Sequence, residues 1–138
     1  MPNYRLLKTE PNTYSYADLE REGKTLWDGV TNALALKHLR AMKKGDLAFV
    51  YHTGEEKQIV GIAEVASDPY PDPQRKEAKL VVVELKPGEK LRRPVTLAEI
   101  KSRKDFADWE LARIGRLSIV PVSEGRWRRL CQMARDTT

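Results

Sequence analysis

Two short segments carry residues whose types no helical or strand period explains. Residues 6–11 read Leu-Leu-Lys-Thr-Glu-Pro, an apolar run that stops in a polar cluster before proline. Sixteen residues after that proline, Trp27-Asp28-Gly29-Val30 sets the largest aromatic ring beside a carboxylate and a glycine. An aromatic wall with a few convergent polar groups is the composition of a concave ligand site. We therefore hypothesise that the two segments face one pocket.

The polar residues nearest that wall are Thr9, Glu10, Asp28 and Asn32. A carboxylate can accept a hydrogen bond from an exocyclic amino group, as it does from N4 of cytosine. The amide of Asn32 both donates and accepts, so it suits the Watson–Crick edge of a base. Two structural alternatives stay open, because Glu10 can bond turn amides and Asn32 can cap the helix that it begins. Asp28 is the favoured ligand contact.

Catalytic and metal chemistry find little support in the sequence. Two histidines and Cys131 cannot complete a zinc site without carboxylates, and no metal-ligand spacing occurs. The eight glycines are scattered, so no phosphate-binding loop is indicated. His52, next to Tyr51 at a strand end, is the one credible general base, and its alternative role is pocket support. We expect no catalytic residue, no metal and no cofactor.

Length and composition indicate one globular domain over residues 1–138, long enough to bury a substantial core. Hydrophobic residues make up 41% of the chain and charged residues 33%, which is ordinary for a folded protein. No apolar run approaches the ~20 residues that span a bilayer, and no secretory signal is visible. A single cysteine suits a reducing interior, so we expect a cytoplasmic protein that does not bind membranes. The oligomeric state is unknown, with a monomer favoured.

The net charge of +5 is unevenly distributed. Residues 1–70 carry nine Lys/Arg against ten Asp/Glu, whereas residues 71–138 carry sixteen against ten. A basic surface attracts phosphates by releasing counterions. A solvated basic surface without a nucleic-acid partner is the equal alternative, so charge alone does not identify a partner.

Hydrophobic patterning predicts an α+β domain. Strands are expected over residues 4–9, 47–52, 58–65, 80–85 and 117–122, and helices over 15–23, 32–42, 96–101 and from 123 onward. Capping boxes of Ser15 with Asp18 and of Thr96 with Glu99 indicate where two of these helices begin. Three prolines in residues 68–73 argue against regular structure there. Lys86-Pro87-Gly88 is expected to end the strand over residues 80–85. Trp109 and Trp127 lie in helical apolar patterns and are assigned to the core. Five or six strands with short helices favour a curled sheet or small barrel.

A set of short motifs occurs in a fixed order along almost the whole chain. The seven motifs are Leu6-Leu7-Lys8-Thr9-Glu10-Pro11, Trp27-Asp28-Gly29-Val30, Met42-Lys43-Lys44-Gly45-Asp46, Val60-Gly61-Ile62-Ala63-Glu64-Val65, Pro69-Tyr70-Pro71-Asp72, Pro94-Val95-Thr96-Leu97 and Arg116-Leu117-Ser118. Together they resemble the EVE domain family. The resemblance implies a PUA-like fold, a curled mixed β-barrel flanked by helices, and kinship with PUA, ASCH and YTH domains, which recognise RNA or modified bases.

The resemblance also implies roles for individual residues. It favours Trp27 as a pocket wall over a core tryptophan. By analogy with the YTH arrangement, Tyr70 becomes the second wall of an aromatic cage, with simple loop anchoring as its alternative. Tyr14 and Tyr16 are weaker candidates, expected to pack the first helix. The basic residues expected to meet phosphates are Lys8, Lys37 and Arg116, of which Arg116 is favoured because it belongs to a family motif.

The resulting hypothesis is a non-catalytic domain that binds DNA or RNA. It takes one extruded base, preferably a modified one, between Trp27 and Tyr70, and reads its edge with Thr9, Glu10, Asp28 and Asn32. Two alternatives remain. The same pocket can bind a free nucleotide-like metabolite, as a sensor or as an enzyme with His52 as base, or the chain can be a protein-interaction domain.

Overall fold

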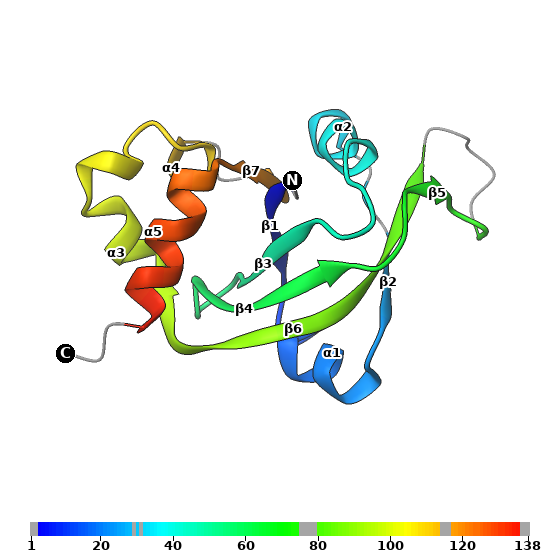
Figure 1. Cartoon of the computed structure of the whole chain (residues 1–138), viewed down its shortest axis with the longest axis horizontal. Helices are drawn as coiled ribbons and strands as arrows, with labels where there is room; N and C mark the ends of the chain where they lie inside the picture. Colours follow the sequence, from blue (N-terminus) through cyan, green and yellow to red (C-terminus); the bar gives the residue numbers. More distant parts are fainter. Residues whose placement is uncertain (1–2, 29, 31, 75–79, 114–116, 136–138) are drawn as a thin grey trace.

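The computed structural model describes residues 3–28, 30, 32–74, 80–113 and 117–135. Within this part of the chain, one curled sheet forms the frame (Figure 1), with the strand order β2-β6-β4-β3-β1-β7 and with β5 paired to β6. The strands are β1 (Tyr4–Thr9), β2 (Thr25–Trp27), β3 (Leu47–His52), β4 (Gln58–Val65), β5 (Tyr70–Pro71), β6 (Val81–Thr96) and β7 (Ile119–Val122). β1 runs parallel to β3, whereas the other pairings are antiparallel, so the sheet is mixed as expected.

Short helices flank this sheet. They are α1 (Tyr16–Glu22), α2 (Ala33–Arg40), α3 (Leu97–Lys101), the 3-10 turn η1 (Lys104–Phe106), α4 (Glu110–Arg113) and α5 (Glu124–Arg135). In Figure 1, α3, α4 and α5 gather at one end of the sheet, while α1 and α2 lie on either side of it further along. No helix in the described residues is long and apolar enough to cross a membrane.

Local capping chemistry fixes where the predicted helices begin. Ser15 Oγ accepts a hydrogen bond from the Asp18 backbone N–H, and Asp18 accepts one from the Ser15 N–H at 2.8 Å, which completes the expected capping box of α1. α1 ends at Gly23, whose left-handed φ of 76° is the conformation that glycine adopts at low cost. Thr96 and Glu99 form the second predicted capping box, at the start of α3.

Two predictions of irregular structure are wrong. Tyr70 and Pro71 form the short strand β5, because they can pair with the edge of β6 opposite Val82 and Val81. The strand expected to end before Lys86 continues to Thr96, with Pro87 paired to Ala63 of β4. Register shifts in the β4–β6 pairing accompany this proline, as is usual where a strand residue lacks its N–H.

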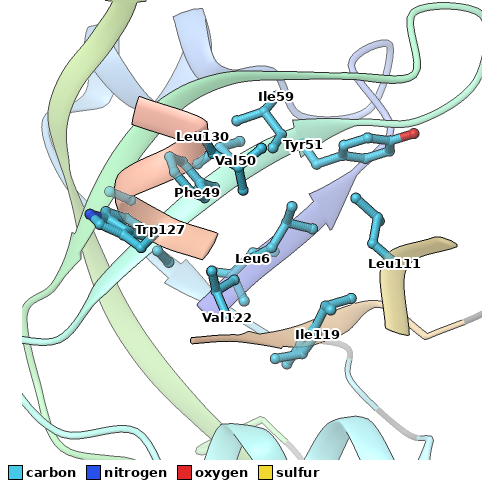
Figure 2. Packing of buried hydrophobic residues seen from close by; sticks show 14 of the residues in the cluster. Leu6, Phe49, Val50, Tyr51, Ile59, Leu111, Ile119, Val122, Trp127 and Leu130 are labelled. Atoms are coloured by element: carbon cyan, nitrogen blue, oxygen red, sulfur yellow. The ribbon is translucent and has the colours of Figure 1, made fainter. Parts of the chain in front are cut away.

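The buried core joins the sheet to its flanking helices, and α5 contributes Trp127 and Leu130 to it. The indole of Trp127 stacks on Phe49 at 3.9 Å and on Tyr4 at 4.5 Å between ring centroids. Figure 2 shows Leu6, Val50 and Leu130 packed around the rings of Trp127 and Phe49. Trp109 is fully buried, and its indole N–H donates to the Pro121 carbonyl at 2.8 Å. Both tryptophans therefore belong to the core, as predicted.

α1 is held against the sheet by a close approach at Gly61. A Cβ on Gly61 would lie 2.4 Å from the Tyr16 ring, so only glycine lets that ring rest on β4. The Tyr16 hydroxyl donates to the Ile62 carbonyl at 2.8 Å, and burial is the main cause that raises the pKa of Tyr16 to about 12. This contact sets the position of the chain that precedes α1.

Gly61→Ala tests this contact. The added methyl group must displace the Tyr16 ring, so we expect the free energy of unfolding to fall by about 1–3 kcal/mol in urea denaturation. Gly125→Ala is the matched control, because its Cβ would meet open space in α5. It should raise stability by about 0.5–1 kcal/mol, and equal effects of the two changes would contradict the close-approach argument.

Candidate functional site

A groove of about 720 Å³ lies where the carboxyl end of β1 meets β2 and the segment before α1. We call it the Trp27 groove. Its lining residues are Lys8, Thr9, Glu10, Thr13, Tyr14, Thr25, Leu26, Trp27, Asp28, Val30, Gln74 and Ser118. The structure thus brings the two segments singled out in the sequence to one groove.

Trp27 holds its place through regular structure rather than through an irregular loop. It is the last residue of β2 and pairs with Val83 of β6, so the expectation that no strand period includes it is wrong. Its ring is half-buried and packs against the core cluster, while it also lines the groove. Such a ring is anchored on one side and available for stacking on the other.

Tyr14 is the second aromatic residue of the Trp27 groove. Sequence reasoning ranked it below Tyr70, although its place just before the Ser15 cap is where an apolar side chain often fixes the entry of a helix. The Tyr14 hydroxyl donates to Glu22 Oε1 at 2.8 Å, and the Tyr14 carbonyl accepts from Thr9 Oγ1 at 2.8 Å. These bonds fix both the ring and the end of β1.

Tyr70 does not line the groove. It pairs with Val82, whereas Trp27 pairs with the next residue, Val83, and successive residues of a strand point to opposite faces. The Tyr70 hydroxyl instead donates to Glu84 at 3.1 Å, and Glu84 also pairs with Lys24 at 2.9 Å. The cage of Trp27 and Tyr70 is therefore not formed, because the register of β6 separates the two rings.

The polar residues at the end of β1 are committed to the local turn. Glu10 Oε2 accepts from the Asn12 backbone N–H at 2.7 Å, which agrees with the structural alternative for this residue. The Thr9 hydroxyl donates to Tyr14, as described above. Asp28 differs from both, because its side chain is exposed and forms no hydrogen bond or ion pair with any described residue. It is the carboxylate of the groove that is available to a ligand.

Two of the predicted residues, Asn32 and Lys37, do not line the Trp27 groove. Asn32 caps α2, with its side-chain oxygen accepting from the Ala35 N–H at 3.0 Å, so its structural alternative applies. Lys37 is exposed on α2 and does not line the Trp27 groove. Arg116 lies outside the described residues, and its predicted role stays a prediction.

Lys8 is the cation of the Trp27 groove. The side chain is half-buried, and its ammonium lies 5.9 Å from the centre of the Tyr51 ring. Burial lowers the pKa of Lys8, because the charged form loses contact with water. With Glu10 and Asp28, the described lining of the groove includes one cation and two carboxylates.

His52 is buried away from the Trp27 groove. Its Nε2 accepts from the Tyr16 backbone N–H at 3.0 Å, so the proton of the neutral ring is on Nδ1, which lies 2.9 Å from Glu56 Oε1. Both nitrogens are thus engaged in holding α1 on the turn after β3, which leaves no free lone pair for a general base. Tyr51 is also buried and does not line the groove.

No group of three His, Cys, Asp or Glu side chains that could hold a metal ion is found within the described part of the chain. Cys131 is half-buried in α5, and burial raises the pKa of its thiol, which is the opposite of what an activated nucleophile needs.

Comparison with known proteins gives the family of this chain. The chain matches the EVE domain family over residues 3–133. Human thymocyte nuclear protein 1 is 36% identical over 118 residues, which cover 73% of this chain and 52% of that protein. The chain spans about half the length or less of the curated thymocyte nuclear proteins that it matches.

Solved structures show the same fold. A protein from Rhodopseudomonas palustris, 41% identical, gives a TM-score of 0.92 and covers 96% of this chain and 92% of that one. The human THYN1 protein in complex with DNA containing 5-methylcytosine, 28% identical, gives 0.90 over 99% of each chain. An ASCH protein from Zymomonas mobilis, 10% identical, gives 0.64 over 95% of each and is similar in fold alone. The predicted PUA-like class is therefore confirmed.

His52→Phe tests the role of the histidine. The change keeps a buried ring but leaves the Tyr16 N–H without its acceptor, so we expect the free energy of unfolding to fall by about 1–3 kcal/mol. Urea denaturation measures this loss, and Glu56→Gln, which keeps an oxygen acceptor, should cost less. Unchanged stability of His52→Phe would contradict the structural role.

Proposed function

The chain belongs to the EVE domain family, and on this premise we propose that it is a non-catalytic domain that binds nucleic acid by holding one base in the Trp27 groove. The observation that carries the proposal is the joint lining of this groove by Trp27, Tyr14 and the exposed carboxylate of Asp28. Its volume of about 720 Å³ falls within the range of small-ligand sites.

The charge of the groove favours a base over a phosphate. Glu10 and Asp28 outnumber Lys8, and two carboxylates repel an anionic group. A nucleobase is neutral, and its amino groups can donate hydrogen bonds to a carboxylate. The flat ring of Trp27 supplies the stacking surface, and such a contact contributes roughly 1–3 kcal/mol per base.

The DNA complex of the human relative suggests which base enters. That protein was solved with DNA containing 5-methylcytosine, and the chain in that structure matches this chain over 99% of each. Cytosine carries an N4 amino group that can donate a hydrogen bond to the Asp28 carboxylate. A methyl group at C5 adds apolar surface that the Trp27 ring can cover, so methylation should strengthen binding. Because a paired base must first leave its stack, single-stranded or mismatched sites should bind more tightly than duplex.

Trp27→Ala is the direct test. We expect the Kd for a 5-methylcytosine oligonucleotide to rise about 5- to 150-fold, which corresponds to the loss of one stacking contact. Fluorescence anisotropy at fixed salt measures this change, with matched unmethylated DNA and RNA oligonucleotides in the same series. Tyr70→Ala is the control, because that ring lies on the other face of β6. Equal binding by wild type and Trp27→Ala would sink the proposal.

Asp28→Asn tests how the base edge is read. The exposed side chain makes no hydrogen bond with a described residue, so stability should stay the same. We expect cytosine-containing oligonucleotides to lose about 10-fold in affinity, while thymine, which has no amino group, loses little. A uniform gain across all bases would show that Asp28 acts through charge alone, because its carboxylate repels the phosphates, and a uniform loss would contradict reading of the amino group.

Free nucleosides separate this proposal from a metabolite-binding site. A nucleic-acid binder should hold 5-methyldeoxycytidine far more weakly than the oligonucleotide that contains it, because the phosphates add affinity. Isothermal titration calorimetry with both ligands measures the ratio, and equal affinities would favour the metabolite alternative.

A further inference from the structure

A second hollow of about 190 Å³ adjoins the Trp27 groove, and Lys8 lines both. We call it the lysine hollow, after Lys8, Lys57 and Lys101, which surround it together with Tyr51 and Thr53. These residues come from β1, β3, the turn between β3 and β4, and the end of α3. In Figure 2, Tyr51 and Leu111, which also line it, lie at the margin of the core cluster.

The charged residues among the described lining of the lysine hollow are all lysines, and this described lining includes no Asp or Glu. Neither Lys57 nor Lys101 forms an ion pair with a described residue, and both are exposed at the rim. Two carboxylates belong to the adjoining turns: Glu56, which hydrogen-bonds His52, and Glu10, whose Oε1 would lie 3.0 Å from a Cβ on Gly54 at the edge of the hollow.

The backbone around the lysine hollow is fixed in place. The Lys57 carbonyl accepts from the Leu97 N–H at 2.8 Å, which ties the β3–β4 turn to the start of α3. The Thr53 N–H donates to the Thr9 carbonyl at 2.9 Å, which ties the same turn to the end of β1. Lys57 itself has a φ of 46°, a left-handed conformation that is uncommon for residues other than glycine. The lysines are therefore presented by a framework rather than by a loose loop.

We propose that the lysine hollow holds a backbone phosphate of the strand whose base lies in the Trp27 groove. This inference rests on the proposed function and deepens it. The two cavities divide the nucleotide by charge, because the described lining of the groove includes two carboxylates and suits a neutral base, whereas that of the hollow includes three lysines and suits the anion. Lys8 lies where they meet, so its half-buried ammonium is placed to approach the phosphate that follows the bound base.

A phosphodiester fits the hollow better than an acidic peptide does. The hollow is small and continues directly into a groove with an aromatic lining, so its occupant must connect to a flat, stackable group. A nucleotide has this connection within one residue, whereas an acidic side chain does not. An acidic peptide is thus an outcome for the test to exclude.

The experiment uses the full chain and the double variant Lys57→Gln/Lys101→Gln. Its matched control is Lys43→Gln/Lys44→Gln, two exposed lysines at the other end of β3 that remove the same charge. The probes are 5-methyldeoxycytidine, its monophosphate and a trinucleotide with this residue in the centre. Calorimetry gives Kd at several salt concentrations, and circular dichroism checks that each variant folds.

We expect the double variant to weaken trinucleotide binding about 10-fold or more and to leave nucleoside binding unchanged. The slope of log K against log salt should become shallower by about 0.7, the value for one phosphate contact on a single strand. The control should change the affinity less than threefold and leave the slope almost unaltered.

Equal effects of the two double variants would overturn the inference, since they would show an unspecific charge effect. Competition by a poly-glutamate peptide as strong as that by the trinucleotide would also overturn it. These failures differ from failure of the proposed function. If Trp27→Ala weakens binding while Lys57→Gln/Lys101→Gln matches its control, the base groove stands and only the phosphate assignment is lost.

Discussion

The parallel pairing of β1 with β3 is the constraint on which the binding surface depends. It places Lys8 beside Tyr51 and Thr9 beside His52, so the carboxyl ends of both strands open at the same edge of the sheet. β7 pairs with β1 on its other side, and the Ser118 carbonyl accepts from the Lys8 N–H at 2.9 Å. A shift of one residue in this register would turn Lys8 to the face where Thr9 now points. The Trp27 groove and the lysine hollow both depend on that register.

The Trp27 groove and the lysine hollow adjoin at this edge and differ in the charge of their linings. The groove combines aromatic rings with carboxylates, whereas the described charged residues that line the adjoining hollow are all lysines. In the binding mode that we propose, the groove reads the base and the hollow holds the phosphate. The buried His52 helps to hold this edge of the sheet together, because its ring hydrogen-bonds both α1 and the β3–β4 turn. Stability and recognition therefore share the same strand ends.

The sequence predicted most regular elements, because their causes are local. Capping boxes at Ser15 and Thr96 set helix starts, and apolar runs marked the central strands. It failed where pairing partners decide the outcome. Pro87 was expected to end a strand, yet β4 offers Ala63 opposite it and β6 continues. Tyr70 was expected on the pocket wall, yet its pairing with Val82 turns it away and Tyr14 takes the second aromatic place.

By itself, the sequence determined the family and the α+β class, because an ordered set of motifs and the local hydrophobic patterns carry both. It gave the shared groove of Trp27, Asp28 and the end of β1 only as a hypothesis, which the structure confirms. Only the tertiary structure decided which second ring lines the groove, that Asn32 and His52 serve structural bonds, and that three lysines distant in sequence surround one hollow. The physical reason is that strand register and turn contacts bring these residues together, and neither is encoded in the neighbourhood of any one of them.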